Sequence, residues 1–161
     1  MSFKIRKIST NDAKFLFDSR NEDTSRNFST NNRNLSFENH KNWLNNFIKN
    51  KNKIGYIFFN NKNIKIGYVR FDLTKSDANV SIFVHKKFRN KGISKKILEL
   101  AEKKIKNKQF KAVVKKNNLK SIALFSSLNY YKYKSVKNFI LMKKNPKKNI
   151  KQYIKIIDQI E

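Results

Sequence analysis

The stretch that decides the fold is Asn79-Val80-Ser81-Ile82-Phe83-Val84, then His85-Lys86-Lys87-Phe88, then Arg89-Asn90-Lys91-Gly92-Ile93-Ser94-Lys95-Lys96. A short apolar run ends in a basic turn with one glycine, and a helical pattern follows. The stretch therefore predicts a strand, a loop and a helix N-terminus. The first N–H groups of a helix lack intrahelical partners, and the helix dipole favours anions there. With a glycine for close approach and Arg and Lys for charge, the loop is a candidate pyrophosphate cradle.

The spacing of this loop separates it from other phosphate loops. The GxxxxGK[ST] spacing of a Walker loop is absent, and one glycine stands where a Rossmann fingerprint has three. Arg89-x-x-Gly92-x-Ser94 resembles the [QR]-x-x-G-x-[GA] acyl-CoA loop of the GNAT superfamily of N-acetyltransferases, with Ser94 in the place of Gly or Ala. By its residues alone, the loop also fits a basic turn before an ordinary amphipathic helix.

A second block, from Asn118 to Tyr130, resembles the N-x-x-A-x-x-L-Y-x-x-x-G-F element of the same superfamily, in the right order and at the right spacing. The resemblance covers at least residues 53–142 and implies that acetyl-CoA is the cofactor. It also implies a set of cofactor-binding residues. These are Ile82, Phe83, Val84, Arg89, Asn90, Lys91, Gly92, Ile93, Ser94, Lys95, Asn118, Ser121 and Phe125.

Composition limits the remaining classes of function. A chain of 161 residues suggests one domain, without the apolar run of a transmembrane helix or a signal peptide, and a cytoplasmic protein is expected. Without Cys, and with two His, no metal site is expected. A net charge of +27 draws anions, but an A/T-rich genome would also enrich Lys. Because the lysines are spread along the chain, no nucleic-acid partner is expected.

The hydrophobic pattern predicts the order β-α-α-β-β-β-α-β-α-β-β. The expected elements are strands 3–8, 54–59, 64–71, 79–84, 110–114, 130–133 and 139–142, and helices after residues 10, 36, 92 and 118. Residues 60–63 and 73–78 read as turns. This order suits the α/β (α+β) GNAT fold that the resemblance implies. That fold has a mixed, largely antiparallel sheet of about seven strands, helices on both faces and two splayed central strands that hold the pantetheine arm.

Domain organisation follows from one proline. Residues 1–145 are expected to form a single GNAT acetyltransferase domain, which Pro146 closes. In residues 146–161, apolar side chains recur at helical spacing, which predicts a C-terminal amphipathic helix. This extension would pack on the domain or on a neighbouring subunit of a homo-oligomer, or would contact a membrane surface.

The catalytic residues of the superfamily are incomplete in this chain. Asn79 matches the position of the usual glutamate base, and Phe125 matches the usual tyrosine acid, so neither side chain can transfer a proton. CoA binding does not depend on them, because it rests on backbone groups. His40 is a candidate base, and Tyr130, Tyr131 or Ser126 is a candidate acid. His40 also fits a core position on the apolar face of its helix.

The N-terminal part of the chain suggests a substrate. Arg20-Asn21, and later Ser36-Phe37-Glu38-Asn39-His40, resemble the nucleotide-linked aminosugar N-acetyltransferases of pseudaminic-acid-type pathways. Thr74-Lys75 resembles a substrate-side pair of that branch. The resemblance implies that Arg20, Asn21, His40, Thr74 and Lys75 bind a uridine diphosphate amino sugar, whose diphosphate needs cationic donors.

Two other functions stay open. One is acetylation of protein N-termini, as in the ribosomal-protein acetyltransferases, which would want an acidic groove for a cationic peptide amine. The other is a GNAT-fold CoA-binding module with impaired catalysis, which Asn79 and Phe125 favour.

Overall fold

In the computed structural model, residues 3–22, 27 and 36–145 are described. The elements are β1 (Lys4–Lys7), η1 (Thr10–Asp12), α1 (Ala13–Asn21), α3 (Phe37–Lys49), β2 (Lys53–Phe59), β3 (Lys65–Leu73), β4 (Asp77–Val84), η2 (Lys86–Phe88), α4 (Ile93–Glu102), β5 (Gln109–Lys115), α5 (Leu119–Ser126), β6 (Tyr130–Val136) and β7 (Phe139–Lys144). The predicted order is confirmed. The expected helix in residues 146–161 lies outside the described residues.

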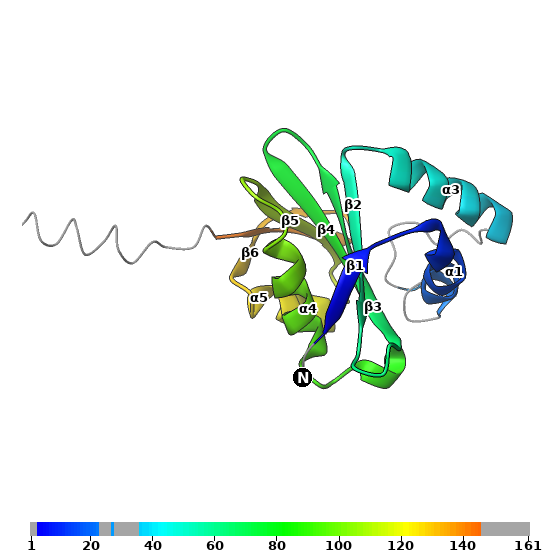
Figure 1. The fold of residues 1–161 in the computed structure, drawn as a ribbon. Helices are drawn as coiled ribbons and strands as arrows, with labels where there is room; N and C mark the ends of the chain where they lie inside the picture. The colour runs from blue at the N-terminus through cyan, green and yellow to red at the C-terminus, as the bar shows by residue number, and fades with distance from the viewer. Residues whose placement is uncertain (1–2, 23–26, 28–35, 146–161) are drawn as a thin grey trace, which may run out of the picture.

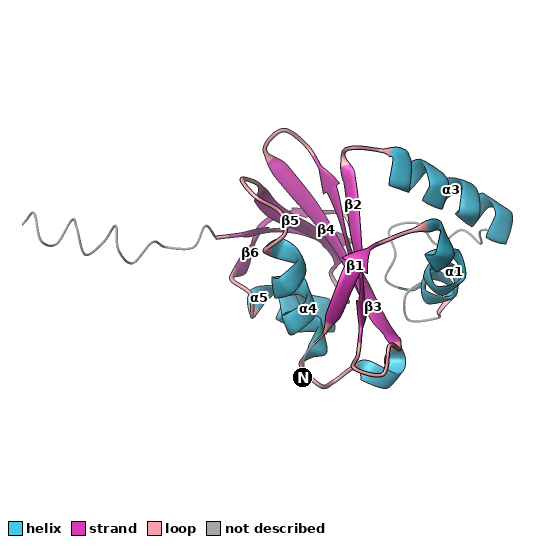
Figure 2. Ribbon diagram, in the orientation of Figure 1, coloured by secondary structure: helices cyan, strands magenta, loops and turns pink. Residues whose placement is uncertain are grey.

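The seven strands form one sheet in the order β1-β2-β3-β4-β5-β7-β6. All neighbouring pairs are antiparallel except β4 and β5, which are parallel. Helices α1 and α3 lie on one side of the sheet, and α4 and α5 lie on the other (Figures 1 and 2). The expected mixed sheet with helices on both faces is therefore confirmed. Within the described part of the chain, no helix is long and apolar enough to cross a membrane.

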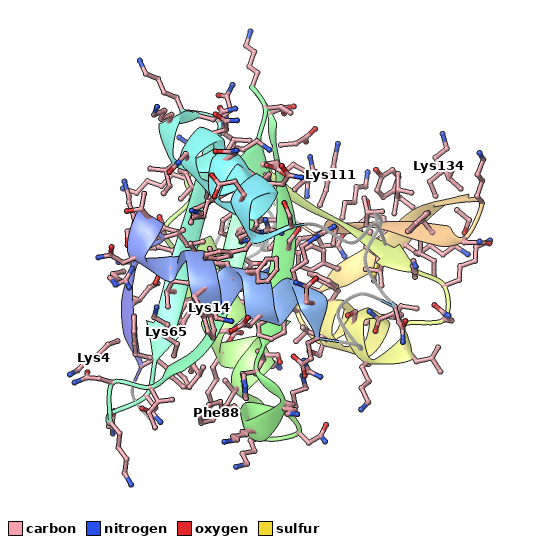
Figure 3. The ribbon with its side chains drawn as sticks, turned by 90° about the vertical axis from the view of Figure 1, so that its right-hand side faces the viewer. Lys4, Lys14, Lys65, Phe88, Lys111 and Lys134 are labelled. Carbon is pink, nitrogen blue, oxygen red and sulfur yellow. The ribbon has the colours of Figure 1, made fainter. Side chains whose placement is uncertain are left out.

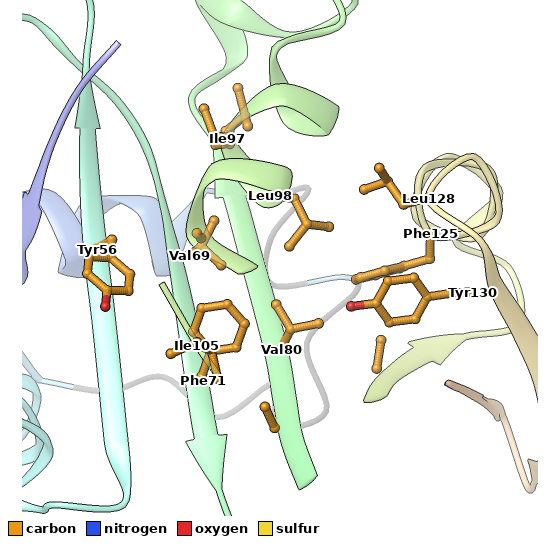
Figure 4. Packing of buried hydrophobic residues seen from close by; sticks show 14 of the residues in the cluster. Tyr56, Val69, Phe71, Val80, Ile97, Leu98, Ile105, Phe125, Leu128 and Tyr130 are labelled. Carbon is orange, nitrogen blue, oxygen red and sulfur yellow. The ribbon is translucent and has the colours of Figure 1, made fainter. Parts of the chain in front are cut away.

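Two apolar clusters fill the layers on either side of the sheet. The larger joins the sheet to α4 and α5 through buried residues such as Phe71, Val80, Leu98 and Phe125 (Figure 4). The smaller joins the sheet to α1 and α3. Its buried residues are Ile8, Leu16, Leu44, Phe47, Ile57, Tyr68 and Phe83. Side chains of one strand alternate between these two layers, so each strand residue is assigned to one face by its register.

Local chemistry explains where several elements begin. Ser36 begins α3, as expected, because its side chain accepts a hydrogen bond from the N–H of Asn39 at 3.2 Å. Asn118 caps α5 in the same way through the N–H of Ser121 at 3.1 Å. The predicted turn 73–78 is shorter than expected, because β3 continues to Leu73 and β4 begins at Asp77.

A buried carboxylate fixes the N-terminal layer against the sheet. Asp12 is fully buried at the start of α1, and the guanidinium of Arg6 and the ammonium of Lys65 both bind it. Burial opposes its charge, but the hydrogen bonds from Arg6 and Lys65 outweigh that cost, and the pKa of Asp12 lies below its ordinary value. This ion cluster joins β1, β3 and α1, and so sets where α1 crosses the sheet.

Candidate functional site

The centre of the site is the place where the two parallel strands separate. The pairing of β4 with β5 covers only Asp77, Ala78 and Asn79 against Gln109, Phe110 and Lys111. Beyond Asn79, β4 continues for five residues to Val84, paired with β3 alone in the register of the sheet. The separation matches the splayed strands that the GNAT resemblance implies.

The backbone of Ile82 points into this separation. The N–H of His85 donates to the carbonyl of Ile66 on β3 at 2.9 Å, and backbone groups of successive residues point alternately to the two sides of a strand. The N–H and C=O of Ile82 therefore point away from β3, toward the side that β5 has left. A ligand with amide groups, such as a pantetheine arm, could pair with them as a further strand would.

The loop after β4 brings a helix N-terminus to the same end of the strand. Gly92 is the N-cap of α4 and has a φ of 68°, and Asn90 has a φ of 60°. Both angles lie in the left-handed region, which glycine and asparagine adopt most readily. A Cβ built on Gly92 would meet no atom within 4 Å. The position of that Cβ is therefore open space at the N-terminal end of α4, and a phosphate placed there could accept from the N–H groups of the first turn, Ile93 to Lys95.

Arg89 contributes to this loop in a way that its motif does not indicate. Its Nε donates to the carbonyl of Val84 at 2.7 Å, and its guanidinium forms an ion pair with Glu22 at 3.0 Å, at the end of α1. The guanidinium carbon also lies 5.6 Å from the centre of the Phe83 ring. These contacts tie the loop to β4 and to α1, so the described role of Arg89 is to position the loop.

On α5, the expected cofactor residues are divided between the helix start and the core. Asn118 and Ser121 form the N-cap hydrogen bond. Phe125 is buried, and its ring packs edge-on against the ring of Tyr130 with 5.0 Å between centroids. At position 125 the chain therefore provides packing where the family usually provides a hydroxyl.

His40 lies inside the layer between α1 and α3. The residue is 3% exposed, its ring contacts those of Phe17 and Trp43, and its Nε2 is buried without a hydrogen-bond partner. Burial, and then the charges of Arg70 and Arg20, lower its pKa to about 4. At neutral pH His40 is uncharged and a weak base, so it is suited to a hydrogen bond with a ligand.

Arg70 is the second polar group of this place, and the sequence did not single it out. It lies on β3, with its guanidinium carbon 5.0 Å from the Trp43 ring and 5.4 Å from the Tyr68 ring. Its Nε is buried without a partner, and in the described part of the chain His40 Nε2 is the only other side-chain atom of this kind. No sequence signal distinguishes this arginine, because its burial depends on α3 folding over β3.

The other expected substrate residues lie elsewhere. Thr74 and Lys75 form the turn between β3 and β4, where the Thr74 hydroxyl accepts from the N–H of Asp77 and both carbonyls accept from Lys108 Nζ. Asn21 is the last residue of α1. The contacts that the structure shows for Thr74 and Lys75 are thus with the turn and with Lys108, and not with His40 or Arg70.

The register places Asn79 in a row of polar residues across one face of the sheet. Asp72 lies opposite Asn79 on β3, and Lys111 lies beside it on β5. Lys53 binds the Asp72 carboxylate at 2.8 Å, and Asp77 binds Lys111 at 2.7 Å. Paired residues point to the same face, so Asp72 presents the carboxylate across the ladder from the position where the family has glutamate. Sequence reasoning missed Asp72, because only strand register shows it.

The two candidate tyrosines point to opposite faces. The Tyr130 hydroxyl donates to Glu102 Oε1 at 2.6 Å in the layer of α4 and α5, and Lys144 binds the other oxygen of Glu102. Burial and Glu102 raise the pKa of Tyr130. Tyr131 is 39% exposed on the opposite face of β6. Because β5 and β7 lie between β6 and β4, neither tyrosine lies on a strand that borders the separation of β4 and β5.

Ser126, the third candidate acid, is the last residue of α5. In the described residues, no group of three or more His, Asp or Glu side chains is placed to hold a metal ion. The chemistry that remains is binding of an acyl thioester along β4 and of an acceptor beneath α1 and α3. Backbone amides could pair with the first ligand, and cationic and aromatic side chains could contact the second.

Comparisons with known proteins agree with this geometry. Residues 13–130 match the model of the acetyltransferase (GNAT) family. A domain from Methanocaldococcus jannaschii DSM 2661 has a similar structure, with 25% identity and a TM-score of 0.79 over 90% of this chain and 99% of that chain. A comparison with curated protein sequences gives no match.

Two solved acetyltransferases that bind CoA share the fold at lower identity. One is spermidine N-acetyltransferase from Vibrio cholerae, in complex with CoA and spermine, with 14% identity and a TM-score of 0.78 over 88% of this chain and 92% of that chain. The other is the PaiA N-acetyltransferase from Thermoplasma acidophilum, in complex with CoA, with 18% identity and a TM-score of 0.74 over 91% of this chain and 100% of that chain.

Proposed function

This chain belongs to the acetyltransferase (GNAT) family and is an acetyl-CoA-dependent N-acetyltransferase, and we propose that its acceptor is the amine of a nucleotide-activated amino sugar. The observation that carries the proposal is the pair of buried nitrogens without partners, His40 Nε2 and Arg70 Nε, beside the Trp43 ring. A buried polar group without a partner costs about 1–3 kcal/mol. Oxygen atoms of a bound diphosphate or sugar would satisfy these groups and recover that cost.

The charge around His40 favours an anionic acceptor. Arg70 and Arg20 both lower the pKa of His40, so the electrostatic potential at its ring is positive. A polyamine carries several positive charges and would be repelled there. The spermidine enzyme from Vibrio cholerae is 14% identical to this chain, and that likeness supports the fold alone. A peptide amine would meet the same repulsion, which disfavours the N-terminal acetyltransferase alternative.

The residues around the strand separation fit CoA. The open space at Gly92, the N–H groups of Ile93 to Lys95 and the backbone of Ile82 would hold the pyrophosphate and the pantetheine arm. When bound, acetyl-CoA supplies the acetyl group as a thioester. Asp72 would accept the amine proton, directly or through water, because it is the carboxylate across the ladder from Asn79.

The proposal is tested by thiol release from acetyl-CoA with three acceptors: a UDP-4-amino sugar, spermidine and an N-terminal peptide of a ribosomal protein. The amino sugar should give the highest kcat/KM. Arg70→Met should raise its KM by about 10- to 100-fold, since a hydrogen bond to a charged group contributes ~1.5–3 kcal/mol. The affinity for CoA, measured by calorimetry, should stay within twofold.

Lys49→Met provides the matched control, because it removes one positive charge at the exposed end of α3. This variant should leave the KM of the amino sugar unchanged. A higher kcat/KM for spermidine or peptide than for the amino sugar, unaffected by Arg70→Met, would overturn the proposal. Thiol release with none of the acceptors, despite CoA binding, would instead support the impaired CoA-binding module.

A further inference from the structure

The half of the sheet formed by β5, β7 and β6 has one face that none of the helices α1, α3, α4 and α5 covers, and among the described residues outside these helices Asn27 contacts it at Lys115. Helix α5 packs on the other face, where Ala112, Met142 and Tyr130 are buried. The register assigns ten residues to the uncovered side, which we call the open face. They are Lys111, Val113, Lys115, Tyr131, Tyr133, Lys134, Val136, Phe139, Leu141 and Lys143. Figure 3 shows Lys111 and Lys134 on this part of the molecule.

Aromatic rings are exposed on the open face. Tyr131 is 39% and Tyr133 41% exposed, and Lys143 Nζ lies 5.4 Å from the centre of each ring. Tyr131 and Tyr133 are two positions apart, so strand alternation places both on the same side of β6, and the register shift between Lys132 and Lys134 brings Lys134 to that side as well. Val113 and Val136 are also at least 40% exposed. Rings that could have been buried are therefore held at the surface, each beside an ammonium group.

The charged residues of the segment that contains β5, β6 and β7 all have the same sign. Residues 103–145 contain thirteen lysines and no Asp or Glu. On the open face, Lys111 is neutralised by Asp77, which belongs to β4, and Lys115 Nζ binds the carbonyl of Asn27. Among the described contacts, Lys134 and Lys143 have no acidic partner within ion-pair distance. The lysines are spread along the sequence, but the fold gathers several around exposed rings.

We propose that the open face binds single-stranded nucleic acid. Bases stack on exposed aromatic rings of a sheet without regard to sequence, and lysines bind the phosphates between them. A face of three strands suits two or three stacked bases, as on other nucleic-acid-binding sheets. A second copy of this chain is disfavoured as the occupant, because it would present the same lysines and repel them. The sequence-based expectation of no nucleic-acid partner was based on where the lysines lie along the sequence, whereas this proposal is based on where the fold places them in space.

The test is fluorescence anisotropy of a labelled 12-nucleotide single-stranded RNA between 50 and 300 mM NaCl, with the full chain. Tyr131→Ala with Tyr133→Ala should weaken binding about tenfold or more, since stacking contributes that much per base. Lys134→Glu with Lys143→Glu should reduce the slope of log Kd against log salt by about 0.7 per lost phosphate contact. A circular dichroism melt of each variant confirms that it is folded.

Matched controls separate this site from the general charge of +27. Lys51→Glu with Lys62→Glu makes the same charge change at two exposed positions of the N-terminal half, and it should weaken binding less than the open-face lysine pair. Equal losses for the two lysine pairs would overturn the proposal. So would competition by uridine diphosphate at concentrations equal to the RNA. A dimer in light scattering that the tyrosine variants dissociate would assign the face to a second copy instead.

Discussion

The two halves of the sheet share one backbone plan but differ in what lies on the face opposite α4 and α5. Over β2, β3 and β4, helices α1 and α3 bury His40 and leave its Nε2 and the Nε of Arg70 without partners. Over β5, β7 and β6, tyrosines are exposed among lysines. In the first half, two buried nitrogen atoms lack hydrogen-bond partners, and the proposed small ligand would supply them. In the second half, exposed rings and ammonium groups would contact the proposed nucleic acid without any buried group being left unpaired.

The two halves of the sheet also differ in how their charged residues are arranged. Nine of the eleven acidic residues of the chain precede Lys103, and in the described structure several neutralise specific cations, as Asp12 does for Arg6. Residues 103–145 contain no acidic residue, so the ion pairs described for this segment use carboxylates from earlier in the chain, as Lys111 does with Asp77 and Lys144 with Glu102. Buried charges in the first half therefore depend on geometry, whereas the second half generates a field that salt screens. The predictions below test this contrast, from the largest expected effect to the smallest.

The largest effect is expected from acidification of the covered half. The pKa of His40 is about 4 in the folded state and near 6.5 when unfolded, so between these values the unfolded state binds more protons. Stability is full above pH 6.5 and falls as the pH drops toward 4, by about 3 kcal/mol. Denaturant unfolding from pH 7.5 to 4 should show this loss in the wild type and a smaller loss in His40→Gln.

The other histidine supplies the control for this prediction. His85 lies in the loop after β4, where its Nδ1 accepts from the N–H of Lys87 at 3.3 Å. His85→Gln removes an imidazole that lies outside the layer of α1 and α3, and it serves as the matched variant in the same unfolding series. Parallel pH curves for His40→Gln and the wild type would show that His40 carries no such linkage, and that its surroundings open before it titrates.

The next effect belongs to the boundary between the halves. Gly92→Asp adds a negative charge at the N-terminus of α4, at a φ of 68° that aspartate tolerates less well than glycine. The affinity for CoA should fall about 100-fold in calorimetry. Gly92→Asn has nearly the same shape, tolerates the left-handed region and adds no charge, so it should lose much less. Unchanged affinity in Gly92→Asp would remove the assignment of this loop to the pyrophosphate.

The sequence allowed the local parts of this site to be predicted and not the long-range parts. The helix starts at Ser36 and Asn118 and the turn at Gly92 depend on residues within a few positions, and the structure confirms them. The unpartnered Nε of Arg70 depends on which helix folds over β3, and the ion pair of Arg89 with Glu22 joins positions 67 residues apart. No periodicity or motif in the sequence predicts either the unpartnered nitrogen or the ion pair.

Some sequence-based predictions of burial and strand position were wrong for a similar reason. Helical spacing from Ile93 and Ile97 predicts that Leu100 is buried in α4, but it is 36% exposed near the end of the helix, whereas Ile105 is buried beyond the helix end. Strand alternation predicts that Tyr130 and Tyr131 face opposite sides of their strand, and the structure agrees, with Tyr130 buried and Tyr131 39% exposed. It could not tell that β6 would be an edge strand, three positions from β4.

The smallest effects concern proton transfer at the boundary. Asp72→Asn should lower kcat by about tenfold or more with little change in KM, because general base catalysis is worth ~10²–10⁴-fold and water can replace part of it. Asp18→Asn is the matched control, since Asp18 forms an exposed ion pair with Lys14 on α1. Equal kcat values for the two variants would exclude Asp72 as the base.

For the acid, the geometry predicts that neither tyrosine contributes. Tyr131→Phe should keep kcat within twofold, because Tyr131 lies on β6, which β5 and β7 separate from β4. Tyr130→Phe should also keep kcat, but it leaves Glu102 without its 2.6 Å donor and should cost about 1–3 kcal/mol of stability. The thiol of CoA is a fair leaving group, with a pKa not far above ~8.5, so water suffices as the proton source. A tenfold fall in kcat for a fully folded Tyr131→Phe would contradict this assignment, whereas a rise in kcat for Phe125→Tyr would show that position 125 still faces the thiolate and lacks only its hydroxyl.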